Sequence, residues 1–177
     1  ITGIEGNHDL CILAKSNSVN NHCSSTIIPY KIPDRADILG HKRFDHVITN
    51  PPYFEAPYHD PSPHSLKAQA MGETLTSLAV WLDYCLRKLH DRGTLTLIYT
   101  ADRIDDVLHS LHKRVGEIKI YPLWNHKRLC KRVIITGRKV TKGGCVLYPG
   151  MIIHNQDGTY TRNALEILSQ GKGLLWD

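Results

Sequence analysis

An asparagine, two prolines and a tyrosine follow one another at Asn50, Pro51, Pro52 and Tyr53, directly after the apolar run 44–49. Proline lacks a backbone N–H and has a fixed φ, so two in succession end a strand and stiffen a loop whose carbonyl groups no helix claims. Such carbonyls and an amide side chain can accept hydrogen bonds from an amino group, while a tyrosine ring can stack on a planar substrate. The alternative is a simple turn in which Asn50 starts the loop and Tyr53 fills the core.

Strands and helices alternate around this loop. Residues 44–49 predict a strand that the prolines end, and residues 55–72, rich in Pro, His and Ser, predict an exposed segment that could act as a lid. The strands expected at 117–123 and 132–138 have no helix between them, so we expect them to pair antiparallel. The elements expected after the lid are a helix at 74–90, a strand at 94–100, a helix capped by Asp102 at 102–114, strands at 117–123 and 132–138, a hairpin around 155–158 and a helix at 163–169.

The beginning of the chain predicts a strand followed by a helix. Residues 1–5 form a short β-like run that ends in Glu5, and apolar residues then recur at helical spacing over 8–20, with Asn7 as the N-cap. Residues 26–30 predict a second short strand, which its proline makes an edge strand. The first strand and the helix are typical of the first half of a βαβ unit.

The composition is that of an ordinary globular protein. The 177 residues are 41% hydrophobic and 22% charged, so we expect one domain over 1–177, with 140–177 as an appended hairpin and short helix. No apolar run approaches the roughly 20 residues of a membrane-spanning helix. Five cysteines without a Cys-x-x-Cys pair favour the cytoplasm, and the eleven histidines lack the spacing of a metal site, so no metal is expected.

Positive charge predicts an anionic partner. The formal net charge is +5, which favours nucleic acid. Trp81 and Trp124 are expected to be packing residues rather than platforms on which bases stack, because Trp81 lies in an amphipathic helix and Trp124 closes a strand. A basic cluster in the bend between the last two core strands could neutralise phosphates, or could be an ordinary solvated turn. It consists of Lys127, Arg128, Lys131 and Arg132.

The run 44–54 closely resembles the small-domain branch of the class I methyltransferases that use S-adenosylmethionine. Within that branch it is most similar to the tRNA1(Val) adenine-N6 methyltransferase family. The likeness covers nearly the whole chain and continues at 78–82, 93–98, 131–134 and 147–150. It implies an α/β fold with a Rossmann-like sheet that ends in an antiparallel strand pair.

The resemblance also implies a cofactor site for S-adenosylmethionine. In the family an acid at the end of the second strand binds the ribose, and Glu5 matches it, although Glu5 could equally cap the following helix. Asp37, or else Asp34, would hold the adenine, and Asn50 would line the site. Nothing here matches the family's first strand with its glycine-rich turn, so the chain is expected to be an N-terminally truncated piece whose sheet has a gap.

The expected activity is methyl transfer to an exocyclic amino group, with Asn50, Pro51, Pro52 and Tyr53 as the catalytic residues. Whole-chain likeness favours adenine N6 in tRNA as the acceptor. The same four-residue signature also serves enzymes that methylate guanine N2 in ribosomal RNA or glutamine N5 in proteins. A hypothesis from another class of function is that the chain is an RNA-binding remnant without catalysis, or a subunit that a partner completes.

Overall fold

A computed structural model describes residues 1–32, 37–52, 78–126 and 129–176. The chain divides into two compact units, residues 1–42 and residues 43–177. No helix in the described ranges is long and apolar enough to cross a membrane. Tyr53, Asp34, Lys127, Arg128 and the expected lid lie outside the described residues.

The first unit is the predicted βαβ unit. Strands β1 (Thr2–Glu5) and β2 (Thr26–Pro29) pair in parallel, and helix α1 (His8–Asn20) connects them. The side chain of Asn7 accepts hydrogen bonds from the backbone N–H groups of Asp9 (2.9 Å) and Leu10 (3.2 Å). This satisfies two of the donors that a helix start leaves without partners, and it confirms Asn7 as the N-cap.

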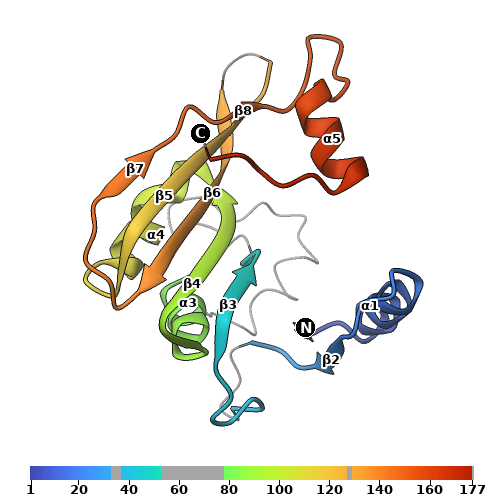
Figure 1. The fold of residues 1–177 in the computed structure, drawn as a ribbon, viewed down its shortest axis with the longest axis vertical. Coiled ribbons are helices and arrows are strands. Elements are labelled where there is room, and N and C mark those ends of the chain that lie inside the picture. Colours follow the sequence, from blue (N-terminus) through green and yellow to red (C-terminus); the bar gives the residue numbers. More distant parts are fainter. Residues whose placement is uncertain (33–36, 53–77, 127–128, 177) are drawn as a thin grey trace, which may run out of the picture. The chain divides into compact units, whose positions relative to one another are not determined.

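The second unit is built on a six-stranded sheet. Its strands run in the order β3-β4-β6-β5-β7 (Figure 1). The short strand β8 also pairs with β5, farther along β5 than β7 does. β3 and β4 are parallel, whereas β6 is antiparallel to both β4 and β5. Its elements are β3 (Phe44–Thr49), α3 (Leu78–Arg87), β4 (Leu89–Thr100), the 3-10 turn η1 (Ala101–Arg103), α4 (Ile104–Leu111), β5 (Val115–Trp124), β6 (Cys130–Lys139), β7 (Cys145–Leu147), β8 (Met151–Ile152) and α5 (Arg162–Gln170).

Helices α3 and α4 cover one face of this sheet. Alternate residues of β4, among them Leu95, Leu97 and Tyr99, are buried against the apolar stripes of the two helices. On the opposite face the paired residues Ile98 and Ile134 are only partly buried. The period of two along each strand therefore separates a helix face from a second face of the sheet.

The chain's end covers part of the second face, at β5. The ring of Trp176 meets the rings of Tyr121 on β5 and Tyr148 edge-on, with centroids 5.3 and 5.4 Å apart. The ammonium group of Lys119 lies 5.9 Å from the centroid of Tyr148 and 6.0 Å from that of Trp176. Edge-to-face rings and a cation over their faces attract one another, so this segment is held to the sheet.

Several boundaries differ from the expectation, and β4, for example, begins at Leu89 and not at 94. The helix expected at 74–90 ends at Arg87, because Leu89 is already paired with Phe44 in the sheet and completely buried there. The helix expected at 102–114 begins at Ile104 and ends at Leu111; its cap residue is Arg103, which makes no side-chain cap bond, so Asp102 as the cap was wrong. Strand β7 was not expected at all.

The gap predicted in the sheet concerns the outer edge of β3. Among the described residues β1 and β2 form a sheet of their own, and β3 stands at the end of the six-stranded order. An edge strand leaves a row of backbone N–H and C=O groups without ladder partners. The described part of the chain therefore has no strand paired with the outer edge of β3.

Candidate active site

The carboxyl end of β3 carries the candidate catalytic loop. β3 and β4 are parallel, and β4 and β5 both pair antiparallel with β6, so the carboxyl ends of β3, β4 and β5 meet at one edge of the sheet. This edge carries Asn50 after β3, Thr100 at the end of β4 and Trp124 at the end of β5. In open α/β sheets ligands bind outside the carboxyl ends of the strands.

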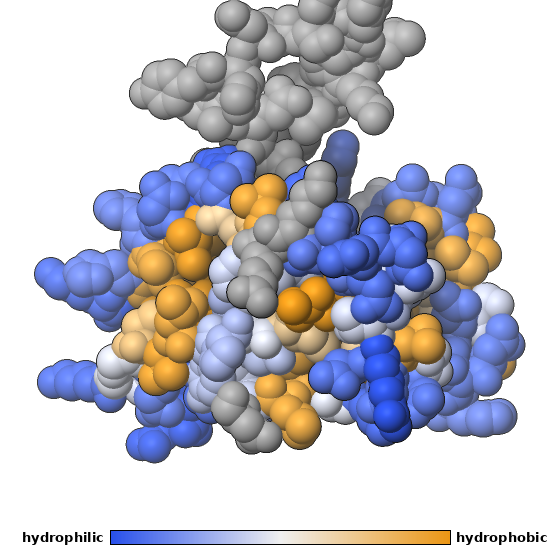
Figure 2. Space-filling view, turned by 90° about the horizontal axis from the view of Figure 1, so that it is seen from above, coloured by the Kyte–Doolittle hydropathy of each residue, from blue (hydrophilic) through white to orange (hydrophobic). Residues whose placement is uncertain are grey.

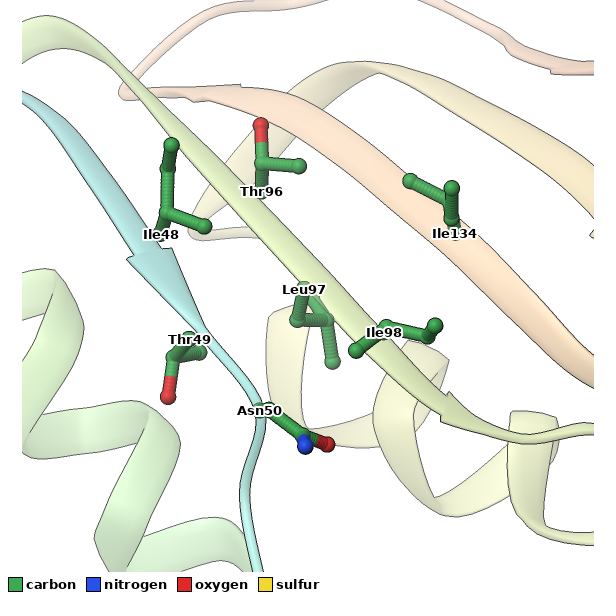
Figure 3. Close-up of a pocket in the computed structure, with 7 residues that line it drawn as sticks. All are labelled: Ile48, Thr49, Asn50, Thr96, Leu97, Ile98 and Ile134. Carbon is green, nitrogen blue, oxygen red and sulfur yellow. The ribbon is translucent and has the colours of Figure 1, made fainter. Parts of the chain in front are cut away.

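The loop has one buried residue between two exposed ones. Pro51 is among the most completely buried residues of the chain, while Asn50 and Pro52 on either side are exposed. In Figure 3 the side chain of Asn50 points away from that of Thr49, on the other side of the strand end. A buried proline ring thus fixes the backbone at the point where the amide of Asn50 reaches outward.

Asn50 lines a pocket of about 350 Å³ on the second face of the sheet (Figure 3). This size lies within the range of small-ligand pockets. The side chain of Ile48 is 82% exposed there, which is unusual for isoleucine in a strand. The lining residues come from β3, β4 and β6 and are Ile48, Thr49, Asn50, Thr96, Leu97, Ile98 and Ile134.

A hydrogen bond ties the start of the loop to helix α3. The indole Nε1–H of Trp81 donates to Oγ1 of Thr49 across 2.9 Å. Thr49 precedes Asn50 directly, and both partners are half-buried. The sequence analysis expected Trp81 to be a packing residue and did not predict this bond; the signal available in the sequence was that a partly buried indole N–H needs an acceptor.

Replacing Trp81 by phenylalanine removes the bond to Thr49. We expect it to lower the turnover of the methyl transfer expected from the sequence about 2- to 10-fold, because a neutral hydrogen bond contributes about 0.5–1.5 kcal/mol to holding the loop. Thr49→Val should lower turnover at least as much, because it also removes the hydrogen bond with Cys85. The double variant should lose no more than Thr49→Val alone, since Trp81 and Thr49 share one bond. Steady-state kinetics measure this, with Thr49→Ser as the control that keeps the hydroxyl. Losses that multiply in the double variant would contradict the coupling.

Burial controls the titration of Cys85, which lies in α3 beside Thr49. Desolvation raises the pKa of its thiol from 9.0 to about 12, against a smaller opposing effect of the hydrogen bond with Thr49. The folded state therefore favours the neutral thiol. Below pH 9 both the folded and unfolded chains hold the proton, and above it the unfolded chain loses the proton first.

The free energy of unfolding should consequently fall between pH 9 and about 12, by up to about 1.4 kcal/mol per pH unit from this group alone. Other groups titrate in the same range, so the test compares wild type with Cys85→Ala in urea titrations at each pH. The difference in unfolding free energy between the two proteins should shrink as the pH rises. Parallel pH profiles would contradict the assignment.

Besides Asn50, two of the predicted cofactor-binding residues are described, and both belong to the first unit. Glu5 ends β1, and its Oε1 accepts a hydrogen bond from the backbone N–H of Asn7 across 2.8 Å, next to the start of α1. Asp37 is exposed, and its backbone oxygen accepts from the N–H of Gly40 in a turn. A carboxylate has about four lone-pair positions. Glu5 can therefore support the helix start and still accept from a ligand's hydroxyl groups.

Half of the predicted basic cluster can be placed. Lys131 and Arg132 are exposed at the beginning of β6, at the same sheet edge as Asn50. Arg132 is paired with Thr100 of β4 on one side and Leu123 of β5 on the other. In the part of the chain that the structure describes, no group of three or more His, Cys, Asp or Glu side chains could hold a metal ion.

Comparison with known proteins identifies the fold. No family profile and no curated protein match this sequence. A predicted O-methyltransferase from Agrobacterium tumefaciens superposes with a TM-score of 0.71 at 17% identity, over 98% of this chain and 78% of that one. The M protein of the type I restriction enzyme EcoKI gives 0.62 at 15%, over 96% and 40%. A tRNA (m1A58) methyltransferase from Aquifex aeolicus gives 0.53 at 10%, over 80% and 53%.

The chain thus spans most of the first of these proteins and about half or less of the other two. At identities this low the likeness concerns the fold. It agrees with a mixed sheet, helices α3 and α4 on one face and the antiparallel pair β5 and β6. The expected fold class is confirmed: the chain has the Rossmann-like α/β fold of these methyltransferase structures.

Proposed function

We propose that the protein is an S-adenosylmethionine-dependent N-methyltransferase that acts on an exocyclic amino group, most favourably adenine N6 in tRNA. The observation that carries the proposal is the exposed Asn50 next to the buried Pro51, at the carboxyl end of a parallel strand in this fold. Two of the matched structures are a predicted O-methyltransferase and a tRNA methyltransferase, which supports methyl transfer as the chemistry.

The acceptor amine explains why an asparagine is needed. An amino group conjugated to an aromatic ring is a poor nucleophile, because its lone pair is delocalised into the ring. The side-chain oxygen of Asn50 and the carbonyl of Pro51 would accept its two hydrogens and favour a pyramidal nitrogen. This is alignment combined with electrostatic preorganisation. Tyr53, outside the described residues, would stack on the acceptor base. That base would be flipped out of its stack in the nucleic acid.

The cofactor would supply the methyl group from its sulfonium centre. Of the residues in place, Glu5 fits the ribose hydroxyls, because its carboxylate ends a parallel strand and keeps acceptor positions beyond the bond from Asn7. Asp37, or else Asp34, would hold the adenine, and Asn50 would adjoin the reacting methyl. The sequence contains no counterpart of the glycine-rich turn that holds the methionine part of the cofactor in the resembling family.

The test is methylation of defined acceptors. The full chain is incubated with S-adenosylmethionine that carries a labelled methyl group and, separately, with tRNA, ribosomal RNA and a peptide-chain release factor. Mass spectrometry of the digested products is expected to find N6-methyladenine in the tRNA. Label in N2-methylguanine or N5-methylglutamine instead would move the acceptor to ribosomal RNA or protein. Failure of the chain to bind S-adenosylmethionine, with tRNA binding retained, would favour the RNA-binding remnant or the partner-completed subunit.

A further inference from the structure

We infer that a second pocket, formed by Trp124, Pro149, Gly150 and Ile152, binds a neighbouring nucleobase of the RNA strand whose adenine is methylated. We call it the flanking-base pocket. Its volume is about 380 Å³, which lies in the range of small-ligand sites. The inference rests on the proposed function, because it takes the acceptor to be RNA.

The pocket is a rigid part of the fold. The indole Nε1–H of Trp124 donates to the backbone oxygen of Pro149 across 2.8 Å, which fixes the plane of the ring. Gly150 has φ +80°, and a side chain there would clash with the backbone oxygen of Pro122 and meet the indole nitrogen. Only glycine allows this close approach. The ring of Trp124 is thus held in place before any ligand arrives.

The side chain next to Trp124 is also fastened to the sheet. Ile152 of β8 is paired with Trp124, and the N–H of Ile153 donates to the oxygen of Trp124 across 2.8 Å. The side chain of Ile152 is 42% exposed. An indole and an isoleucine side by side on adjacent strands form an apolar surface, which suits a flat heterocycle better than a charged group.

The flanking-base pocket lies at the same sheet edge as Asn50. From β3 to β5 there are three strand spacings, and Trp124 is three residues beyond Tyr121, which shares the row of Ile98 and Ile134 next to Asn50. A register shift between Leu123 and Trp124 interrupts the alternation of faces along β5 at this point. Strand spacing and rise put the two sites about 15–20 Å apart. A few nucleotides of an extended single strand span that distance, so one strand can occupy both sites.

Positive charge lies along this path. Arg132 is paired with Leu123 next to Trp124 and, on its other side, with Thr100 of β4, and Lys131 precedes it; both side chains are exposed. Cationic side chains beside an aromatic platform are typical of single-strand binding, where the cations follow the phosphates and rings take the bases. In Figure 2 hydrophobic and hydrophilic residues intermix on the face seen from above. The cationic side chains of Lys131 and Arg132 beside the ring of Trp124 favour RNA over a protein acceptor.

The experiment measures binding of a 5′-fluorescein-labelled single-stranded RNA that carries one adenine among uridines, by fluorescence anisotropy. A series of the same RNA has one abasic site at each position in turn. For wild type, an abasic site at one position on one side of the adenine should weaken binding about tenfold, since a stacked base contributes about 1–3 kcal/mol. Trp124→Ala should bind the intact RNA about tenfold more weakly and be insensitive to that abasic site.

Two further variants separate recognition from folding. Trp124→Phe keeps an aromatic face and should stay within about threefold of wild type, while Ile152→Ala trims a partly exposed wall and should weaken binding about threefold. Circular dichroism of each variant confirms the fold. If the RNA affinity of Trp124→Ala and Ile152→Ala equals that of wild type, or if no abasic position matters, the pocket assignment is overturned.

Methyl transfer to the same RNA is measured in parallel, so that the two proposals fail separately. Transfer by wild type without any effect of Trp124→Ala on binding would overturn the flanking-base pocket and leave the proposed function standing. Position-specific binding that depends on Trp124, without methyl transfer, would support the pocket and count against the function. A DNA strand of the same sequence bound equally tightly, with the same dependence on Trp124, would overturn the choice of RNA.

Discussion

Replacing Asn50 by alanine is expected to lower the rate of methyl transfer at least 100-fold while the fold stays intact. Loss of one preorganised hydrogen-bonding group at a reacting centre typically costs about 100- to 1,000-fold in turnover. Because Asn50 is exposed, the substitution should change the free energy of unfolding by less than about 0.5 kcal/mol. Methylation kinetics and urea unfolding measure the two quantities separately.

His46→Gln is the matched control for Asn50→Ala, because His46 is an exposed residue of the same strand β3 and lines no part of the pocket. Its turnover should equal that of wild type. Cofactor affinity in Asn50→Ala should fall much less than turnover, since the proposed bonds are made to the reacting amine. Unchanged turnover in Asn50→Ala would refute the catalytic assignment of this loop.

Replacing Glu5 by alanine is expected to weaken S-adenosylmethionine binding about 10- to 100-fold. Hydrogen bonds from hydroxyl groups to a charged acceptor contribute about 1.5–3 kcal/mol, and the ribose offers two hydroxyls. The carboxylate also accepts from the N–H of Asn7, so part of the effect of Glu5→Ala could arise from a disturbed helix start. Isothermal titration calorimetry on the full chain measures the dissociation constant.

Glu5→Gln separates the two roles. Glutamine keeps an oxygen that can accept from Asn7, but it removes the negative charge that ribose hydroxyls would meet. We therefore expect Glu5→Gln to retain the stability of α1 and still to lose about tenfold in affinity. Asp9→Asn, an exposed acid in the first turn of the same helix, should leave affinity unchanged. Equal affinity in wild type and Glu5→Gln would assign Glu5 to the helix start alone.

Local sequence signals predicted the elements that they alone determine. The strand at 44–49 ends where two prolines remove ladder donors, and α1 begins where Asn7 supplies a cap; both match the structure. The end of α3 was predicted too late, because the apolar spacing of the helix continues into Leu89. There the pairing with Phe44 overrides helix propensity. Register between distant strands is a tertiary property and leaves little trace in a local pattern.

The same limit applies to the candidate site. Asn50 could be identified from its own neighbours in the chain, whereas the bond between Trp81 and Thr49 joins residues 32 positions apart. The flanking-base pocket depends on β7 and β8, two short strands that lie along β5 and that include only one predicted segment. The sequence therefore indicates Asn50 as a candidate residue, whereas the contacts between distant residues around it become visible only in the structure.

The pleat of β3 has a consequence for how this chain can change over time. Thr49 faces α3 and Asn50, the next residue, faces the other way (Figure 3). Side chains alternate between the two faces along a strand, so the direction of the Asn50 amide depends on its position being one residue after Thr49. Inserting or deleting a single residue within β3 would exchange the two directions and turn Asn50 toward the helices. Mutational drift can alter the residue types in β3, but a change of one residue in its length keeps Asn50 facing outward only where a β-bulge absorbs it, as at the register shift between Phe44 and His46.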